Sequence, residues 1–137
     1  MNVKRKIQIV DSKGSKSEAI ISGYLDTTTR ECHIQLSYGE VQLQGLGMNF
    51  FEAFCRVREQ LQNSGLLPIC YGACRNVWPS GMLADMCLGI FANVLEDRSK
   101  PAGEVDIFDS GSEMDLVSVE EQKAFARSFF VFSKPTH

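Results

Sequence analysis

Apolar and polar residues alternate along three segments in the first part of the chain, and this period of two predicts β-strands with one buried face. The segments are 4–10, 19–25 and 32–38, with polar turns between them. In the third segment, the apolar face is formed by Cys32, Ile34, Leu36 and Tyr38. A tight turn at residues 39–40 leads into a fourth alternating segment that starts at Val41. The simplest arrangement of the four strands is an antiparallel meander.

The period changes after residue 48 to that of an α-helix. A single apolar stripe is formed by Phe50, Phe54, Val57 and Leu61. Asn49 and Glu52 have the spacing of a capping box, and Gly65 tolerates the left-handed conformation that ends many helices. We therefore predict a helix between Asn49 and Gly65 that lies across one face of the sheet.

The second half of the chain alternates short apolar runs with turn residues. Residues 66–72 are an apolar run typical of a short buried strand. Ser80 is a residue type that caps helix starts, which predicts a short helix from Gly81 or Met82. The pattern of residues 89–95 fits a helix and a strand equally well.

The last third predicts one more strand and one more helix. Residues 105–109 predict the strand, and residues 109–115 a polar linker. Ser118 and Glu121 repeat the capping-box spacing at the start of a helix with an aromatic stripe of Phe125, Phe129 and Phe132. The predicted fold is one α+β domain over residues 1–137. It has an antiparallel or mixed sheet of about five to seven strands with two to three helices packed on it.

Charge and cysteine content narrow the classes of function. No apolar run approaches the roughly 20 residues that span a membrane. Five cysteines, an odd number, fit reduced thiols better than a disulfide framework, so we expect a cytoplasmic protein without a membrane contact. The formal net charge of −3 opposes binding of nucleic acid. It therefore disfavours a function in which Tyr24 and Tyr38 stack the bases of a single strand on the sheet.

Acidic residues are concentrated late in the chain. Residues 96–121 hold nine acidic and two basic side chains, a local charge of −7, whereas residues 1–16 have a local charge of +4. Because an acidic surface attracts a basic partner, the lead prediction is a non-enzymatic domain that binds a basic protein. The carboxylates expected to face the partner are Asp106, Asp109, Glu113 and Asp115.

The segment CYGACRNVWPSGMLADMC, residues 70–87, holds three of the five cysteines and the only tryptophan. Arg75 and Trp78 are residue types enriched at binding hot spots, so both are predicted to contact the partner, although Trp78 also suits the core. Cys70 and Cys74 are spaced more widely than a CxxC pair, and no second pair follows. Neither a metal site nor a cofactor is therefore predicted.

Two other functions would use the same segment. A nucleophilic Ser80 or Cys74 would need His33 as its base, but no Gly-x-Ser-x-Gly elbow surrounds Ser80, so no catalytic residue is predicted. The alternative to protein binding is a small enzyme or ligand-binding protein with an anion site at the helix start, where N–H groups are free donors. Its residues would be Arg75, Ser80, Gly81 and Met82. In a simpler interpretation, Ser80 caps these donors and Arg75 pairs with an acidic residue.

The central segment YGACRNVWPSGMLADMCLG, with VDIFD after it, resembles a family of small bacterial single-domain proteins without an assigned activity. The residues that carry the resemblance are Arg75, Val77, Trp78, Pro79, Ser80, Gly81, Met82, Asp85 and Met86. Small acidic proteins of this kind are similar to immunity proteins, which neutralise toxin domains. The resemblance therefore implies a concrete form of the lead prediction, an immunity protein that neutralises a bacterial toxin by occlusion.

Overall fold

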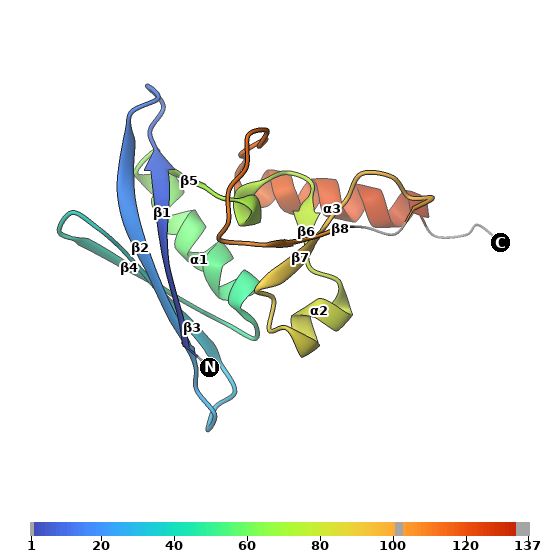
Figure 1. Cartoon of the computed structure of the whole chain (residues 1–137), viewed down its shortest axis with the longest axis horizontal. Coiled ribbons are helices and arrows are strands. Elements are labelled where there is room, and N and C mark those ends of the chain that lie inside the picture. Colours follow the sequence, from blue (N-terminus) through green and yellow to red (C-terminus); the bar gives the residue numbers. More distant parts are fainter. Residues whose placement is uncertain (1, 101–102, 134–137) are drawn as a thin grey trace.

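The computed structural model describes residues 2–100 and 103–133, with side chains as far as residue 130. Its first half is the predicted meander of β1 (Asn2–Val10), β2 (Lys16–Leu25), β3 (Cys32–Tyr38) and β4 (Val41–Gly47). The short strand β5 (Leu67–Ile69) pairs with β1. The sheet therefore has the order β4-β3-β2-β1-β5, and all of its pairs are antiparallel (Figure 1).

Helix α1 (Phe50–Asn63) covers one face of this sheet, here called the inner face (Figure 1). The side chain of Asn49 accepts a hydrogen bond from the Glu52 N–H at 2.8 Å, which is one of the two hydrogen bonds of the predicted capping box. Gly65 follows the helix with a φ of +70°, the left-handed conformation that glycine adopts without strain. The predicted apolar stripe of this helix is fully buried.

Two glycines of β4 bring α1 unusually close to the sheet. A Cβ atom at Gly45 would meet the carbonyl of Ala53, and one at Gly47 would lie 2.6 Å from the Ala53 nitrogen. Both glycines lie on the inner face of β4, because their spacing of two residues places them on the same side of the strand. The absence of side chains at these positions therefore sets the distance between helix and sheet.

The second half of the chain forms a separate small sheet. Its strands are β6 (Val77–Trp78), β7 (Phe91–Val94) and β8 (Gly103–Asp106), in the order β6-β7-β8. A 3₁₀ turn, η1 (Tyr71–Ala73), precedes β6, and the short helix α2 (Gly81–Met86) precedes β7. The α+β antiparallel class is thus confirmed, with the strands divided between two sheets.

The structure decides two predictions in this half. Residues 89–95, which fitted both a helix and a strand, contain the strand β7. The strand predicted over residues 105–109 is wrong at its end, because β8 stops at Asp106. There the Asp106 side chain accepts a hydrogen bond from the Phe108 N–H at 2.9 Å, which turns the chain.

Helix α3 (Val119–Ser133) closes the fold, and its capping box is reciprocal as predicted. The Ser118 N–H donates to the Glu121 carboxylate at 3.2 Å, and the Glu121 N–H donates to the Ser118 hydroxyl at 3.1 Å. Of the predicted aromatic stripe, Phe125 and Phe129 stack with ring centroids 6.3 Å apart. The side chain of Phe132 lies outside the described residues. Among the helices that the structure describes, none is long and apolar enough to cross a membrane.

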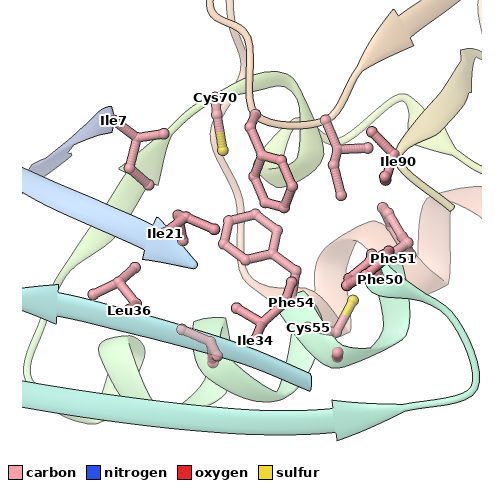
Figure 2. Packing of buried hydrophobic residues seen from close by; sticks show 14 of the residues in the cluster. Ile7, Ile21, Ile34, Leu36, Phe50, Phe51, Phe54, Cys55, Cys70 and Ile90 are labelled. Atoms are coloured by element: carbon pink, nitrogen blue, oxygen red, sulfur yellow. The ribbon is translucent and has the colours of Figure 1, made fainter. Parts of the chain in front are cut away.

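One core joins the two halves of the molecule. Figure 2 shows side chains of the five-stranded sheet packed against the aromatic residues of α1, with Cys70 and Ile90 of the second half beside them. The rings of Phe54 and Phe108 meet edge to face at 5.2 Å. Four cysteines are buried in this core as free thiols, as expected: Cys32, Cys55, Cys70 and Cys74.

Candidate functional site

Arg75 lies between η1 and β6, where two carboxylates hold it. Its Nε donates to Oδ2 of Asp115 at 2.8 Å, and its Nη2 lies 3.7 Å from Oε2 of Glu121. The backbone N–H of Arg75 also donates to the carbonyl of Asp115 at 2.9 Å. The hydrogen bond from its side chain to Asp115 raises the pKa of Arg75. The chain's own carboxylates therefore already compensate this guanidinium.

An open hollow of about 740 Å³ lies beside this ion pair. Its charged lining residues are Arg75, Glu96, Glu113 and Asp115, and its apolar lining residues are Leu95, Met114 and Phe125. Three carboxylates and one guanidinium give the lining a formal charge of −2. We call this site the acidic hollow. It combines exposed carboxylates with the half-buried apolar side chains of Met114 and Phe125.

The acidic hollow is assembled from segments that are distant in sequence. Glu96 follows β7, Glu113 and Asp115 belong to the polar linker, and Phe125 comes from α3. The linker is fixed by an isolated antiparallel bridge between Cys74 and Leu116. The sequence predicted Glu113 and Asp115 from their charge alone, and no local pattern marks Glu96 or Phe125 as their neighbours.

A buried polar cluster holds the segment that carries Arg75 into the hollow. Gln122 of α3 is fully buried, and its Nε2 lies 2.9 Å from each of the carbonyls of Gly72, Cys74 and Val77. Its Oε1 accepts a hydrogen bond at 2.6 Å from Arg58. Because an amide has only two N–H groups, the three carbonyls share them. Gln122 thereby fixes the backbone on both sides of Arg75.

Arg58 of α1 is the second member of this cluster and is 3% exposed. It donates to the carbonyls of Gly72 and Val117, both at 3.0 Å, as well as to Gln122. Its Nε has no hydrogen-bond partner among the described atoms. Burial lowers the pKa of Arg58, but a guanidinium remains charged at any physiological pH. The cluster is therefore a buried cation held by carbonyl and amide oxygens.

Arg58 and Gln122 were not predicted from the sequence, although a signal for each is present. Arg58 lies one turn after Phe54, which places a cation at the edge of the apolar stripe of α1. Gln122 lies between the buried residues Val119 and Ala126 with helical spacing. A polar residue within an apolar stripe is either exposed to solvent or buried with hydrogen-bond partners. Both positions are therefore candidates for a buried hydrogen-bond network.

Trp78 of β6 lies away from the acidic hollow. Its ring meets that of Phe51 edge to face at 5.2 Å, so much of the indole packs on the core. The remaining surface lines a second hollow of about 490 Å³ together with Ser80, Lys123 and the first turns of α1. The two residues predicted as anchors, Arg75 and Trp78, therefore belong to different hollows.

The residues of the alternative anion site do not lie in one hollow either. The Ser80 hydroxyl accepts a hydrogen bond from the Leu83 N–H at 3.1 Å, as a helix cap does. Ser80 and Gly81 line the second hollow, Met82 is 62% exposed, and Arg75 lines the acidic hollow. The observed contacts thus match the simpler interpretation, in which Ser80 caps α2 and Arg75 pairs with acidic residues.

Two of the four predicted partner-facing carboxylates lie elsewhere. Asp106 receives a hydrogen bond from Arg5 at 3.0 Å, and its side chain is only 11% exposed. It therefore ties β8 to β1 instead of facing a partner. Asp109 is exposed, and its carbonyl accepts a hydrogen bond from the Tyr71 N–H at 2.8 Å. Neither residue lines the acidic hollow.

The candidate nucleophiles and base are separated by the sheet. His33 lies on the outer face of the five-stranded sheet, where its ring stacks on Tyr24 with centroids 4.5 Å apart. Cys74 is buried in the core, and burial raises its pKa to about 11. In the part of the chain that the structure describes, no group of three or more His, Cys, Asp or Glu side chains is placed to hold a metal ion.

The two tyrosines of the disfavoured base-stacking function lie on different faces of the sheet. Tyr24 is exposed on the outer face, but Tyr38 packs against the core on the inner side. The period of two explains this difference, because Tyr38 shares its face of β3 with Ile34 and Leu36. The two tyrosines therefore do not form one platform.

No protein-family model matches the chain, and no curated protein matches it significantly.

Proposed function

We propose that this chain is a protein-binding domain that recognises a basic protein through the acidic hollow. The observation that carries the proposal is the convergence of Glu96, Glu113 and Asp115 in one hollow that Phe125 also lines. Such a site combines two contributions to binding. Carboxylates speed the encounter with a basic partner, and burial of apolar surface slows its release.

The state of Arg75 supports a basic rather than an acidic ligand. Asp115 and Glu121 already occupy its guanidinium, so an anion would have to displace them. The lining as a whole keeps a formal charge of −2. A lysine or arginine of the partner would meet Glu96 and Glu113, which form no ion pair with any residue that the structure describes.

The concrete form of the proposal is an immunity protein that neutralises a bacterial toxin by occlusion. The resemblance of residues 71–89 to small bacterial single-domain proteins supports it, as does the acidic docking site, since toxins that act on nucleic acid are basic. This chain would cover the toxin's active surface without altering it chemically. The buried free thiols support a cytoplasmic location, where cysteines stay reduced.

The test of this function requires a toxin gene that adjoins the gene for this chain, and the toxin domain that it encodes is then the binding partner in the assay. Glu96→Gln together with Glu113→Gln removes two negative charges from the acidic hollow. We expect the association rate with that toxin to fall by about tenfold at low ionic strength and the difference to shrink as salt is added. The rate is measured by surface binding kinetics, and protection by growth of cells that express the toxin.

A matched control separates the hollow from the overall charge. Glu31→Gln with Glu40→Gln removes the same charge from two exposed positions at turns of the meander. This pair should leave the association rate and the protection of cells nearly unchanged. Equal losses with both pairs would show that only the net charge matters and would overturn the acidic hollow as the docking site.

A further inference from the structure

A third hollow, of about 370 Å³, lies where β6 packs against α3 (Figure 1). It is lined by Trp78 of β6 and by four residues of α3, which are Lys123, Ala126, Arg127 and Phe130. The four residues have the helical spacing i, i+3, i+4 and i+7, so they form one face of α3. The two cations give the lining a formal charge of +2, and we call this site the basic hollow.

The two cations of the basic hollow lack a counter-charge within the described part of the chain. Neither Lys123 nor Arg127 forms an ion pair with any residue that the structure describes, although Glu52 shares the second hollow with Lys123. The Cys55 thiol beside Lys123 does not compensate it either, because burial raises the pKa of Cys55 and keeps it neutral. Lys123 is half-buried, and a charge that is partly removed from water without a partner has an energetic cost. A bound anion would reduce this cost.

The polar side-chain groups that line the basic hollow are all hydrogen-bond donors. The indole of Trp78, the ammonium of Lys123 and the guanidinium of Arg127 each donate, and none of them accepts. A peptide brings as many N–H donors as C=O acceptors, so its N–H groups would find no side-chain acceptor here. Phosphate oxygens are strong acceptors and form charge-assisted hydrogen bonds with lysine and arginine. The lining therefore suits a phosphate better than an acidic peptide.

Aromatic side chains form most of the apolar lining of the basic hollow. Trp78 packs edge to face on Phe51, and the rest of its surface borders both the second hollow and the basic hollow. Phe130, at the end of the α3 face, is 40% exposed. Aromatic side chains stack on nucleobases, with a contribution of about 1–3 kcal/mol per base. A ligand with a flat ring beside its phosphate would use both parts of this lining.

From this geometry we infer that the basic hollow binds a nucleoside phosphate. The base stacks on Trp78, and the phosphate groups bind Lys123 and Arg127. The volume of the hollow lies within the range of small-molecule sites, and the second hollow, which shares Trp78 and Lys123, extends the space for the ligand. The net charge of −3 opposes a long nucleic acid strand, whereas a single nucleotide needs positive charge only at its own site.

This inference is independent of the proposed function. The acidic hollow shares no lining residue with the basic hollow or with the second hollow. The acidic hollow has a formal charge of −2 and the basic hollow one of +2, so they attract ligands of opposite sign. Failure of one proposal does not affect the other.

The experiment titrates the full chain with ADP and follows the fluorescence of Trp78. Because Trp78 is the only tryptophan, the signal reports on the two hollows that it lines and not on the acidic hollow. We expect saturable quenching that weakens as salt is added. Adenosine lacks the phosphates and pyrophosphate lacks the base, so each should bind about tenfold more weakly than ADP or worse. An oligoglutamate peptide should also bind more weakly than ADP.

Charge variants locate the site. Lys123→Gln and Arg127→Gln each remove one cation from the basic hollow, and each should weaken ADP binding by about tenfold. The control Lys16→Gln removes the same charge from an exposed position at the start of β2 and should bind ADP like the native chain. Circular dichroism checks that all variants are folded. The absence of saturable quenching by ADP in the native chain overturns the inference. So do equal effects of the three variants, or binding of adenosine, pyrophosphate or oligoglutamate that is as tight as that of ADP.

Discussion

At the scale of single residues, Arg58 and Gln122 form a buried polar pair with several backbone partners. Gln122 forms hydrogen bonds with three carbonyls and with Arg58, and these hydrogen bonds are buried. A buried polar group without a partner costs about 1–3 kcal/mol. Removal of Gln122 or Arg58 would leave several buried groups without a hydrogen bond. The pair connects α1, the segment around η1 and the start of α3.

Gln122→Leu should therefore lower the free energy of unfolding by about 3 kcal/mol or more. Gln122→Glu tests which contact matters. A carboxylate can pair with Arg58, but it cannot donate to the three carbonyls, so we expect this variant to be destabilised as well. Urea denaturation measures both. A native-like Gln122→Glu variant would show that the carbonyl contacts contribute little.

The buried thiols predict how stability depends on pH. Burial raises the pKa of Cys70 to about 12 and that of Cys74 to about 11, from an ordinary value of 9.0. Above pH 9, the unfolded chain loses these protons while the folded chain keeps them. The contribution is therefore fully present below pH 9 and is lost as the pH rises towards 11 and 12.

We expect the free energy of unfolding to fall between pH 8 and pH 10.5 more steeply for the native chain than for Cys70→Ala. The comparison between the two proteins cancels the titration of tyrosines and lysines. Urea denaturation at a series of pH values measures it. Parallel curves for the two proteins would contradict the assigned burial of the Cys70 thiol.

At the scale of elements, the contact between α1 and β4 depends on two missing side chains. A Cβ at Gly45 would meet the Ala53 carbonyl and would lie 2.9 Å from the Arg56 Cβ. The backbone of a helix cannot move aside as a flexible side chain can. The helix would have to lift from the sheet, which strains the core beneath it.

Gly45→Ala should accordingly lower the free energy of unfolding by about 2 kcal/mol. The matched control is Gly103→Ala in β8, where an added Cβ has no atom within 4 Å. We expect this control to be nearly neutral in thermal unfolding. A similar loss in both variants would mean that glycine itself, and not the contact with the helix, determines the effect.

The sequence predicts those elements whose signals are local. Alternation placed the meander, and cap residues placed the starts of α1, α2 and α3. The sequence does not predict contacts between distant segments, such as the one between Arg5 and Asp106, which are 101 residues apart. For this reason, the acidic residues were predicted as one surface, while the structure gives Asp106 a partner and gathers Glu96, Glu113 and Asp115 in one hollow.

At the scale of the whole molecule, the charge of the acidic hollow depends on Arg75. Arg75→Ala changes the formal charge of the lining from −2 to −3. If a basic ligand binds there, the association rate should stay the same or rise at low ionic strength. If an anion binds, affinity should be lost. Stopped-flow kinetics with a peptide rich in lysine and arginine distinguishes the two results.

The most direct test of the docking site is an amide chemical-shift map of the native chain during titration with that basic peptide at low salt. We predict that the shifted signals cluster at Arg75, Glu96, Glu113 and Phe125, and that added salt reverses the shifts. Shifts confined to the outer face around Tyr24, or to the second hollow around Ser80, would contradict the account. So would an unchanged spectrum at the highest peptide concentration.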